Sequence, residues 1–113
     1  MVILTLLMLH VLLSVVLIGA ITHQALSFWK PTPASPRNMV TNFRAVRSSV
    51  YTNTIAILYV LTSILGAVVY PTYVLDAKKP LTDMNLKLAI GAFEVKEHFV
   101  IIGMAILPAY LAY

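Results

Sequence analysis

The residues best suited to chemistry in this sequence are two histidines, His10 and His98, which lie early in two separate apolar segments. At 1.5 Å per helical residue, both lie about 5–10 Å below the same expected membrane surface. Imidazole is a common axial ligand of haem iron, and helical bundles hold such cofactors between facing helices. The pair therefore predicts a b-type haem between His10 and His98. The simpler interpretation is that each histidine only bonds to nearby backbone or water.

Glu94 offers a second use for the same histidines, as ligands of a metal ion other than haem iron. It precedes His98 by four residues, so the two side chains leave a helix on one face. Together with His10 they form a candidate metal site, and two imidazoles favour copper or zinc over magnesium. The spacing is specific to neither metal.

Glu94, Lys96 and Glu97 form a charged cluster beside His98. An acidic residue at the centre of a bilayer costs about 2.5–3.5 kcal/mol, so such residues usually pair, conduct protons or contact another subunit. At the membrane surface, in contrast, Lys96 reaches the head groups, and the carboxylates pair with cations such as Lys87 or those of a partner. The sequence leaves open a proton-conducting cluster, an ion-pair cluster and plain interfacial solvation.

Five residues near the other end of the apolar segments are candidate contacts for a quinone or for another subunit: His23, Gln24, Arg44, Arg47 and Tyr51. A quinone site needs a hydrogen-bond donor for each carbonyl and an apolar slot for the tail. The competing interpretation is an interfacial histidine beside arginines that only orient the chain.

Three apolar helices are expected to position these residues. Of the 113 residues, 60% are hydrophobic and 11% are charged, and about twenty apolar residues cross the roughly 30 Å of a bilayer core. The segments 2–29, 42–70 and 83–112 predict an all-α integral membrane bundle that forms a single domain over residues 1–113. The third segment is the weakest, because its uninterrupted apolar run, residues 99–113, covers only about 22 Å. No length remains for a soluble catalytic domain.

The charge distribution predicts the orientation of the bundle. The net charge of +4 arises mainly between residues 30 and 50, where four basic residues face no acidic one: Lys30, Arg37, Arg44 and Arg47. By the positive-inside rule this loop is cytoplasmic and the N-terminus lies outside. The excess charge is therefore a topology signal and not a nucleic-acid footprint. The chain has no cysteine, which excludes disulfides and iron–sulfur clusters.

Prolines and polar residues predict where the helices end and which faces turn inward. We expect Pro71 to end the second helix, and Thr82 or Asp83 to cap the third. Small and polar residues repeat at helical spacing and should face the interior, since lipid gains nothing from them. On the first helix His10, Ser14 and Gln24 share one face with Ile21, and His23 lies nearly opposite. The face of the second helix holds Thr52, Ala56, Tyr59, Ser63, Gly66 and Tyr70, and that of the third holds Gly91, Glu94, His98, Ala105 and Ala112.

No P-loop, nucleophile elbow, zincin motif or dinucleotide fingerprint is present. In size and hydropathy the chain resembles membrane-anchor and small cytochrome b-like subunits of respiratory complexes. The leading hypothesis is an accessory or anchor subunit of a larger membrane oxidoreductase in a prokaryotic inner membrane, not catalytic alone, with lipid and other membrane subunits as partners. The alternatives are a structural or assembly subunit without a cofactor, and a proton-conducting element that uses Glu94, Glu97 and His98.

Overall fold

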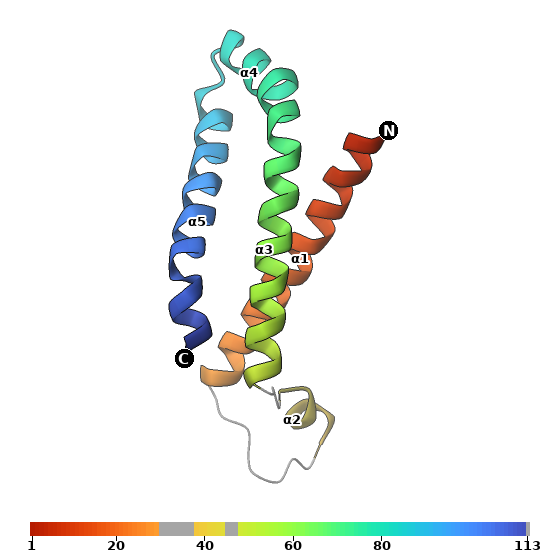
Figure 1. Ribbon diagram of the computed structural model, residues 1–113, viewed down its shortest axis with the longest axis vertical. Coiled ribbons are helices and arrows are strands. Elements are labelled where there is room, and N and C mark those ends of the chain that lie inside the picture. Colours follow the sequence, from red (N-terminus) through yellow and green to blue (C-terminus); the bar gives the residue numbers. More distant parts are fainter. Residues whose placement is uncertain (30–37, 45–47, 113) are drawn as a thin grey trace.

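The computed structural model describes residues 1–29, 38–44 and 48–112, and every element within these ranges is helical (Figure 1). The prediction of an all-helical chain is confirmed. Three long helices account for most of the structure, namely α1 (Val2–Trp29), α3 (Ser48–Tyr73) and α5 (Lys87–Ala112). Short elements occupy the connections: α2 (Met39–Arg44), the π-helical turn η1 (Val74–Lys78) and α4 (Lys79–Asp83).

The long helices lie side by side along the longest dimension of a 59 × 29 × 24 Å molecule. Figure 1 shows α3 between α5 and the N-terminal half of α1, which crosses α3 and diverges from it. The C-terminal ends of α1 and α5 lie near each other at the end of the long helices that is farther from α4 (Figure 1). The arrangement is therefore closed at one end and splayed at the other.

Two helical stretches in the described part of the chain are long and apolar enough to cross a membrane, Val2–Trp29 and Ser49–Asp83. The first coincides with the predicted segment 2–29. It forms one helix because it contains no proline and no charged side chain that would interrupt an apolar run of 28 residues. The helix α5 is not one of the two. Its membrane crossing therefore stays a prediction.

The second helix differs from its predicted bounds of 42–70 at both ends. A separate helix, α2, begins after Asn38, whose Oδ1 accepts a hydrogen bond from the Thr41 backbone N–H at 3.0 Å, a typical N-cap. At the other end α3 continues through Pro71 to Tyr73, so the expected stop at Pro71 is wrong. A proline removes one backbone hydrogen bond but does not forbid a helix that its neighbours hold in place. The wider turn η1 then continues the chain.

The expected N-cap of the third helix at Thr82 or Asp83 is also wrong, because these residues end α4. Asn85 has φ 55°, and the Leu86 N–H bonds to the Leu81 carbonyl at 2.9 Å while the Asn85 N–H bonds to the Thr82 carbonyl at 3.0 Å. This pair of bonds is a Schellman motif with asparagine at its left-handed position. It reverses the chain so that α5 begins at Lys87.

The core is thin and lies between α1 and α3. The buried apolar side chains are Leu17, Ile55, Ala56 and Val69, and α5 contributes none. Most of the large apolar side chains on all three long helices are exposed. A structure with so little buried apolar area suits an apolar surrounding, whereas in water it would expose most of its hydrophobic surface.

Candidate functional site: polar contacts between the helices

His10 joins α1 to α3 through its ring. Its Nδ1 lies 3.0 Å from the backbone carbonyl of Thr62. A carbonyl only accepts, so Nδ1 carries the hydrogen, and Nε2 of the neutral ring keeps a free lone pair. The ring fits because α3 has Gly66 there: a Cβ on that residue would lie 3.1 Å from Cε1 of His10. The α1–α3 contact therefore orients this histidine as a ligand would need.

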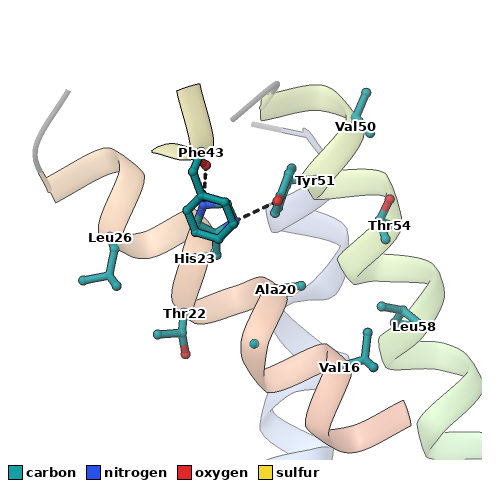
Figure 2. A pocket seen from close by; sticks show the side chains of 11 residues that line it. Val16, Ala20, Thr22, His23, Leu26, Phe43, Val50, Tyr51, Thr54 and Leu58 are labelled. Atoms are coloured by element: carbon teal, nitrogen blue, oxygen red, sulfur yellow. Dashed lines mark hydrogen bonds between the residues drawn. The ribbon is translucent and has the colours of Figure 1, made fainter. Parts of the chain in front are cut away.

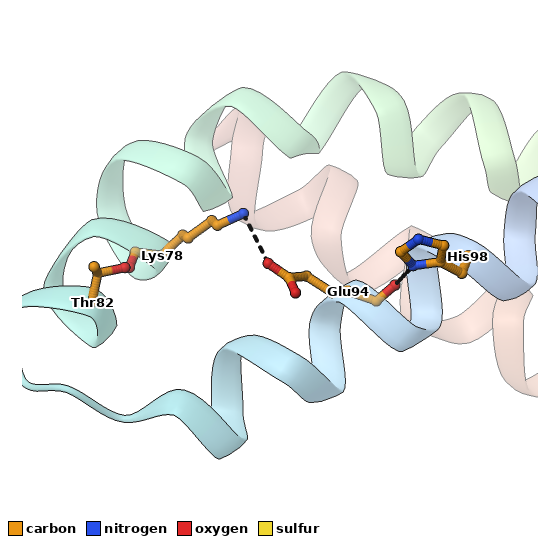
Figure 3. Close-up of polar contacts among 4 residues, drawn as sticks. All are labelled: Lys78, Thr82, Glu94 and His98. Carbon is orange, nitrogen blue, oxygen red and sulfur yellow. Dashed lines mark hydrogen bonds and ion pairs between the residues drawn. The ribbon is translucent and has the colours of Figure 1, made fainter.

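His98 has the same bonding pattern on α5 but a different setting (Figure 3). Its Nδ1 lies 2.6 Å from the backbone carbonyl of Glu94, one turn earlier, which again leaves Nε2 with a lone pair. The side chain is exposed. The Glu94 carboxylate pairs with Lys78 of η1 at 3.6 Å, and this cation is not the Lys87 considered from the sequence.

The structure does not gather the predicted haem and metal ligands into one site. His10 contacts α3, and His98 bonds to its own helix. Among the described residues, no group of three or more histidine, aspartate or glutamate side chains lies close enough to hold a metal ion. His10, Glu94 and His98 are therefore not assembled as a three-residue site within the chain, and the haem stays a prediction.

The charged cluster at the start of α5 is spread around the helix. Lys96 Nζ lies 4.8 Å above the ring of Phe93, and Phe93 stacks on Tyr73 of α3 with ring centroids 3.9 Å apart. Glu97 is half-buried, whereas Glu94 and Lys96 are exposed. The Tyr73–Phe93 stack and the Lys78–Glu94 ion pair thus join the N-terminal end of α5 to α3 and η1. Proton conduction by Glu94, Glu97 and His98 stays a prediction.

The helix α5 is rotated relative to the predicted packing face. Of the predicted inward stripe only Gly91 is partly covered, and the exposed members are Glu94, His98, Ala105 and Ala112. The partly covered residues are instead Ile90, Gly91, Glu97, Val100, Gly103, Leu107 and Tyr110. Aromatic contacts decide the rotation. Tyr73 stacks on Phe93, and the Tyr59 hydroxyl donates to the Val100 carbonyl at 2.8 Å.

A close approach at mid-height locks α3 to α5. The Tyr59 ring lies directly over Gly103, where an added Cβ would overlap the phenol oxygen. Glycine is therefore required at this position for the Tyr59 hydroxyl to reach the backbone of α5. The stripe predicted for the second helix is largely confirmed, since Thr52, Ala56, Tyr59, Ser63 and Gly66 are buried or half-buried, and only Tyr70 is exposed.

At the closed end of the molecule, Gln24 links all three long helices. Its Nε2 donates to Thr52 Oγ1 at 3.2 Å, and its Oε1 accepts from the Tyr110 hydroxyl at 2.5 Å. Gln24 is only 6% exposed, so both ends of a buried amide are satisfied. Gln24 and Tyr110 also line an open pocket of about 240 Å³ that extends to Tyr59. The Gln24 amide therefore joins the three long helices through both its nitrogen and its oxygen.

His23, next to Gln24, faces the other side of α3 and has both ring nitrogens engaged (Figure 2). Nε2 lies 2.9 Å from the Phe43 carbonyl, and Nδ1 lies 2.7 Å from the Tyr51 hydroxyl. The carbonyl requires Nε2 to donate, so Nδ1 of the neutral ring accepts the Tyr51 proton. Phe43 also stacks on His23 with centroids 4.6 Å apart. The short helix α2 thus covers the histidine.

The His23–Tyr51 pair lies near one end of a groove of about 660 Å³ between α1 and α3. The groove is open on one side, and its lining is mainly apolar: Val16, Gly19, Ala20, Thr22, Leu26, Phe43, Val50, Thr54 and Leu58, together with the pair. Of the five predicted quinone contacts, His23 and Tyr51 line the groove and Gln24 does not. The Arg44 side chain and Arg47 lie outside the described residues.

Comparison with protein-family models, with curated proteins and with solved structures found no match to this chain. Function must therefore be argued from the contacts above.

Several partners in these contacts were absent from the sequence prediction. Phe43 covers His23, Lys78 pairs with Glu94, Thr62 orients His10, and Tyr110 holds Gln24. Thr62 acts through its backbone carbonyl and not through its side chain. The residue types along a sequence do not indicate which backbone carbonyl will accept a hydrogen bond from a distant side chain. An amide near the end of an apolar helix was, in contrast, a signal for a polar partner on another helix.

Proposed function

We propose that this chain crosses a membrane three times with its N-terminus outside. Two helical stretches meet the length and hydropathy that a span requires. The third helix, α5, has 26 residues, or about 39 Å, which exceeds the roughly 30 Å of a bilayer core. Its exposed apolar surface supports the same location. The basic loop between residues 30 and 50 supports the orientation.

We further propose that the chain is an accessory or anchor subunit of a larger membrane oxidoreductase complex, in which His10 and His98 are haem ligands. One observation carries this proposal. Both residues bond through Nδ1 to a backbone carbonyl and keep a lone pair on Nε2. Histidines that ligate metals almost always have their second nitrogen held in this way. The third histidine, His23, lacks this arrangement, because both of its nitrogens are engaged within the chain.

A bound haem would supply one-electron transfer at such a site. The protein would orient both rings. The Thr62 carbonyl and the space left by the missing side chain of Gly66 would hold His10. The Glu94 carbonyl would hold His98. His98 is exposed, so its Nε2 is open to a cofactor that another subunit also contacts. Because α3 lies between α5 and the N-terminal half of α1 (Figure 1), a single haem held by both histidines would require α5 to shift relative to α3.

The test is the visible spectrum of the chain purified with its native partners in mild detergent. We expect a Soret band that weakens or shifts in His10→Ala or His98→Ala. The matched control is His23→Ala, which should leave the band unchanged. A spectrum without a Soret band, or one that responds equally to all three substitutions, contradicts the proposal.

The exposed face of α5 supports a second candidate function, docking without a cofactor. Glu94 and His98 are exposed on a helix that contributes no buried residue, and ionisable groups at membrane depth usually contact another subunit. Replacement of either residue (Glu94→Gln or His98→Ala) should then release the partner subunits during purification. An intact complex that has lost only its haem spectrum would exclude this function.

A further inference from the structure

The groove between α1 and α3 has a polar end that the proposed haem function does not use. His23 and Tyr51 form this end, and Phe43 lies over His23 (Figure 2). Farther along the helices the lining is mainly apolar, with Ala20 about one turn and Val16 and Leu58 about two turns from the pair. Leu58 is seven residues from Tyr51, which is about 10 Å of helix. The groove is therefore a slot with one polar end.

The hydrogen bonds inside the chain determine what the polar end offers to a ligand. Nε2 of His23 donates to the Phe43 carbonyl, so its Nδ1 takes the hydrogen of the Tyr51 hydroxyl. The phenol oxygen then has lone pairs but no hydrogen left to donate. With neutral His23, Tyr51 therefore accepts a hydrogen bond from a ligand and cannot give one. This favours a ligand hydroxyl over a ligand carbonyl.

Thr54 adds a second polar group one turn from Tyr51 on the same helix. Thr54 is one of the lining residues and is exposed. Among the described lining residues, none carries a permanent charge. A neutral ligand with hydroxyl groups matches this end, whereas the phosphate of a phospholipid would meet no cation in the described lining.

We propose that this groove binds a lipid-soluble hydroquinone. A ring hydroxyl donates to Tyr51, and the apolar tail lies between α1 and α3 along Ala20 and Leu58. This inference rests on the proposed function only in that a membrane oxidoreductase has a use for such a ligand. The geometry of the groove itself does not involve His10 or His98.

Binding can be measured by anaerobic titration calorimetry on the full chain in lipid nanodiscs, with decylubiquinol and decylubiquinone as probes. We expect the reduced probe to bind about three- to tenfold more tightly than the oxidised one, the value of one hydrogen bond. Tyr51→Phe should remove that preference. Equal affinity for both probes, or an unchanged preference in Tyr51→Phe, would overturn the proposal.

Two glycine substitutions separate the groove from the rest of the fold. An added Cβ meets no heavy atom within 4 Å at Gly19 or at Gly91, so the space beside both backbone positions is open. Only Gly19 lines the groove. Gly19→Leu should abolish binding of the reduced probe, and Gly91→Leu should preserve it. Binding that survives Gly19→Leu overturns the proposal.

Two further outcomes have a defined meaning. With the chain in detergent instead of nanodiscs, displacement of the probe by a phospholipid of matched tail length would show that the slot holds an acyl chain and would also overturn the proposal. Hydroquinone binding without a Soret band would contradict the haem function and leave the groove assignment standing. The two proposals can thus fail separately.

Discussion

At the residue scale, the three histidines differ in what their ring nitrogens contact. His10 and His98 each use Nδ1 on a backbone carbonyl, whereas His23 uses both nitrogens. A carbonyl can only accept, so its presence determines which nitrogen carries the hydrogen. At two positions the histidine therefore keeps a lone pair for a ligand, and at the third both ring nitrogens are hydrogen-bonded within the chain.

The buried amide of Gln24 permits a double-mutant test at this scale. Tyr110→Phe and Gln24→Leu each remove the bond between the two side chains. We expect a coupling free energy of about 0.6–1.7 kcal/mol from unfolding measurements on both single variants and the double variant in detergent. Fully additive single effects would show that the contact contributes nothing.

At the scale of the elements, a few polar and aromatic contacts position α5, which contributes no fully buried apolar side chain. The Tyr73–Phe93 stack, the bond of Tyr59 to the α5 backbone and the Tyr110–Gln24 bond lie at three heights along the helix. Helices surrounded by lipid gain little from apolar contact with each other, so close approach and hydrogen bonds decide the packing.

The Tyr59–Gly103 contact gives a prediction about this packing. Gly103→Ala should destabilise the protein by about 1–3 kcal/mol, because the new methyl group overlaps the phenol. In a Tyr59→Leu background the same substitution should cost much less. The measurement is thermal unfolding in detergent.

Gly91→Ala is the matched control for that prediction. No heavy atom lies within 4 Å of the added Cβ, so the helix should be stabilised by about 0.5–1 kcal/mol. An equal loss of stability in Gly91→Ala and Gly103→Ala would contradict the steric explanation.

The turn before α5 gives a second prediction for the elements. Asn85 has φ 55°, and a β-branched residue in this conformation is strained. Asn85→Val should therefore destabilise the protein by about 1–2 kcal/mol, and Asn85→Gly should be neutral or mildly stabilising. Chemical denaturation of both variants provides the comparison. An Asn85→Val variant as stable as the unsubstituted protein would show that residue 85 does not adopt the left-handed conformation.

At the scale of the whole molecule, the exposed apolar surface and the basic loop together support a membrane location. The chain lacks native cysteines, so single introduced cysteines report topology without background. Ser35→Cys lies in the basic loop, Asp76→Cys in η1 and Ala112→Cys at the end of α5.

In intact cells an impermeant maleimide should label only the Asp76→Cys variant. The other two should react after the membrane is permeabilised. Labelling of Ala112→Cys from the same side as Asp76→Cys would show that α5 does not cross, and the reverse pattern would invert the orientation.

Local signals predicted some boundaries correctly and missed others. The first helix was predicted at its observed bounds because an unbroken apolar run leaves no alternative. Pro71 predicts a helix end that does not occur, because the chain stays helical through Tyr73, whose ring stacks on Phe93. Asn85 is a typical helix-end residue, whereas Thr82 and Asp83, which have the residue types of an N-cap, end α4.

The sequence by itself determined the helical class, the apolar stretches, the basic loop and the identity of the histidines. These follow from composition and from local spacing along one chain. Only the tertiary structure decided which face of α5 turns inward, which nitrogen of each histidine is free, and that the adjacent residues His23 and Gln24 serve different sites. The partners that decide these properties are backbone carbonyls and aromatic rings on other helices, and no local pattern encodes their positions.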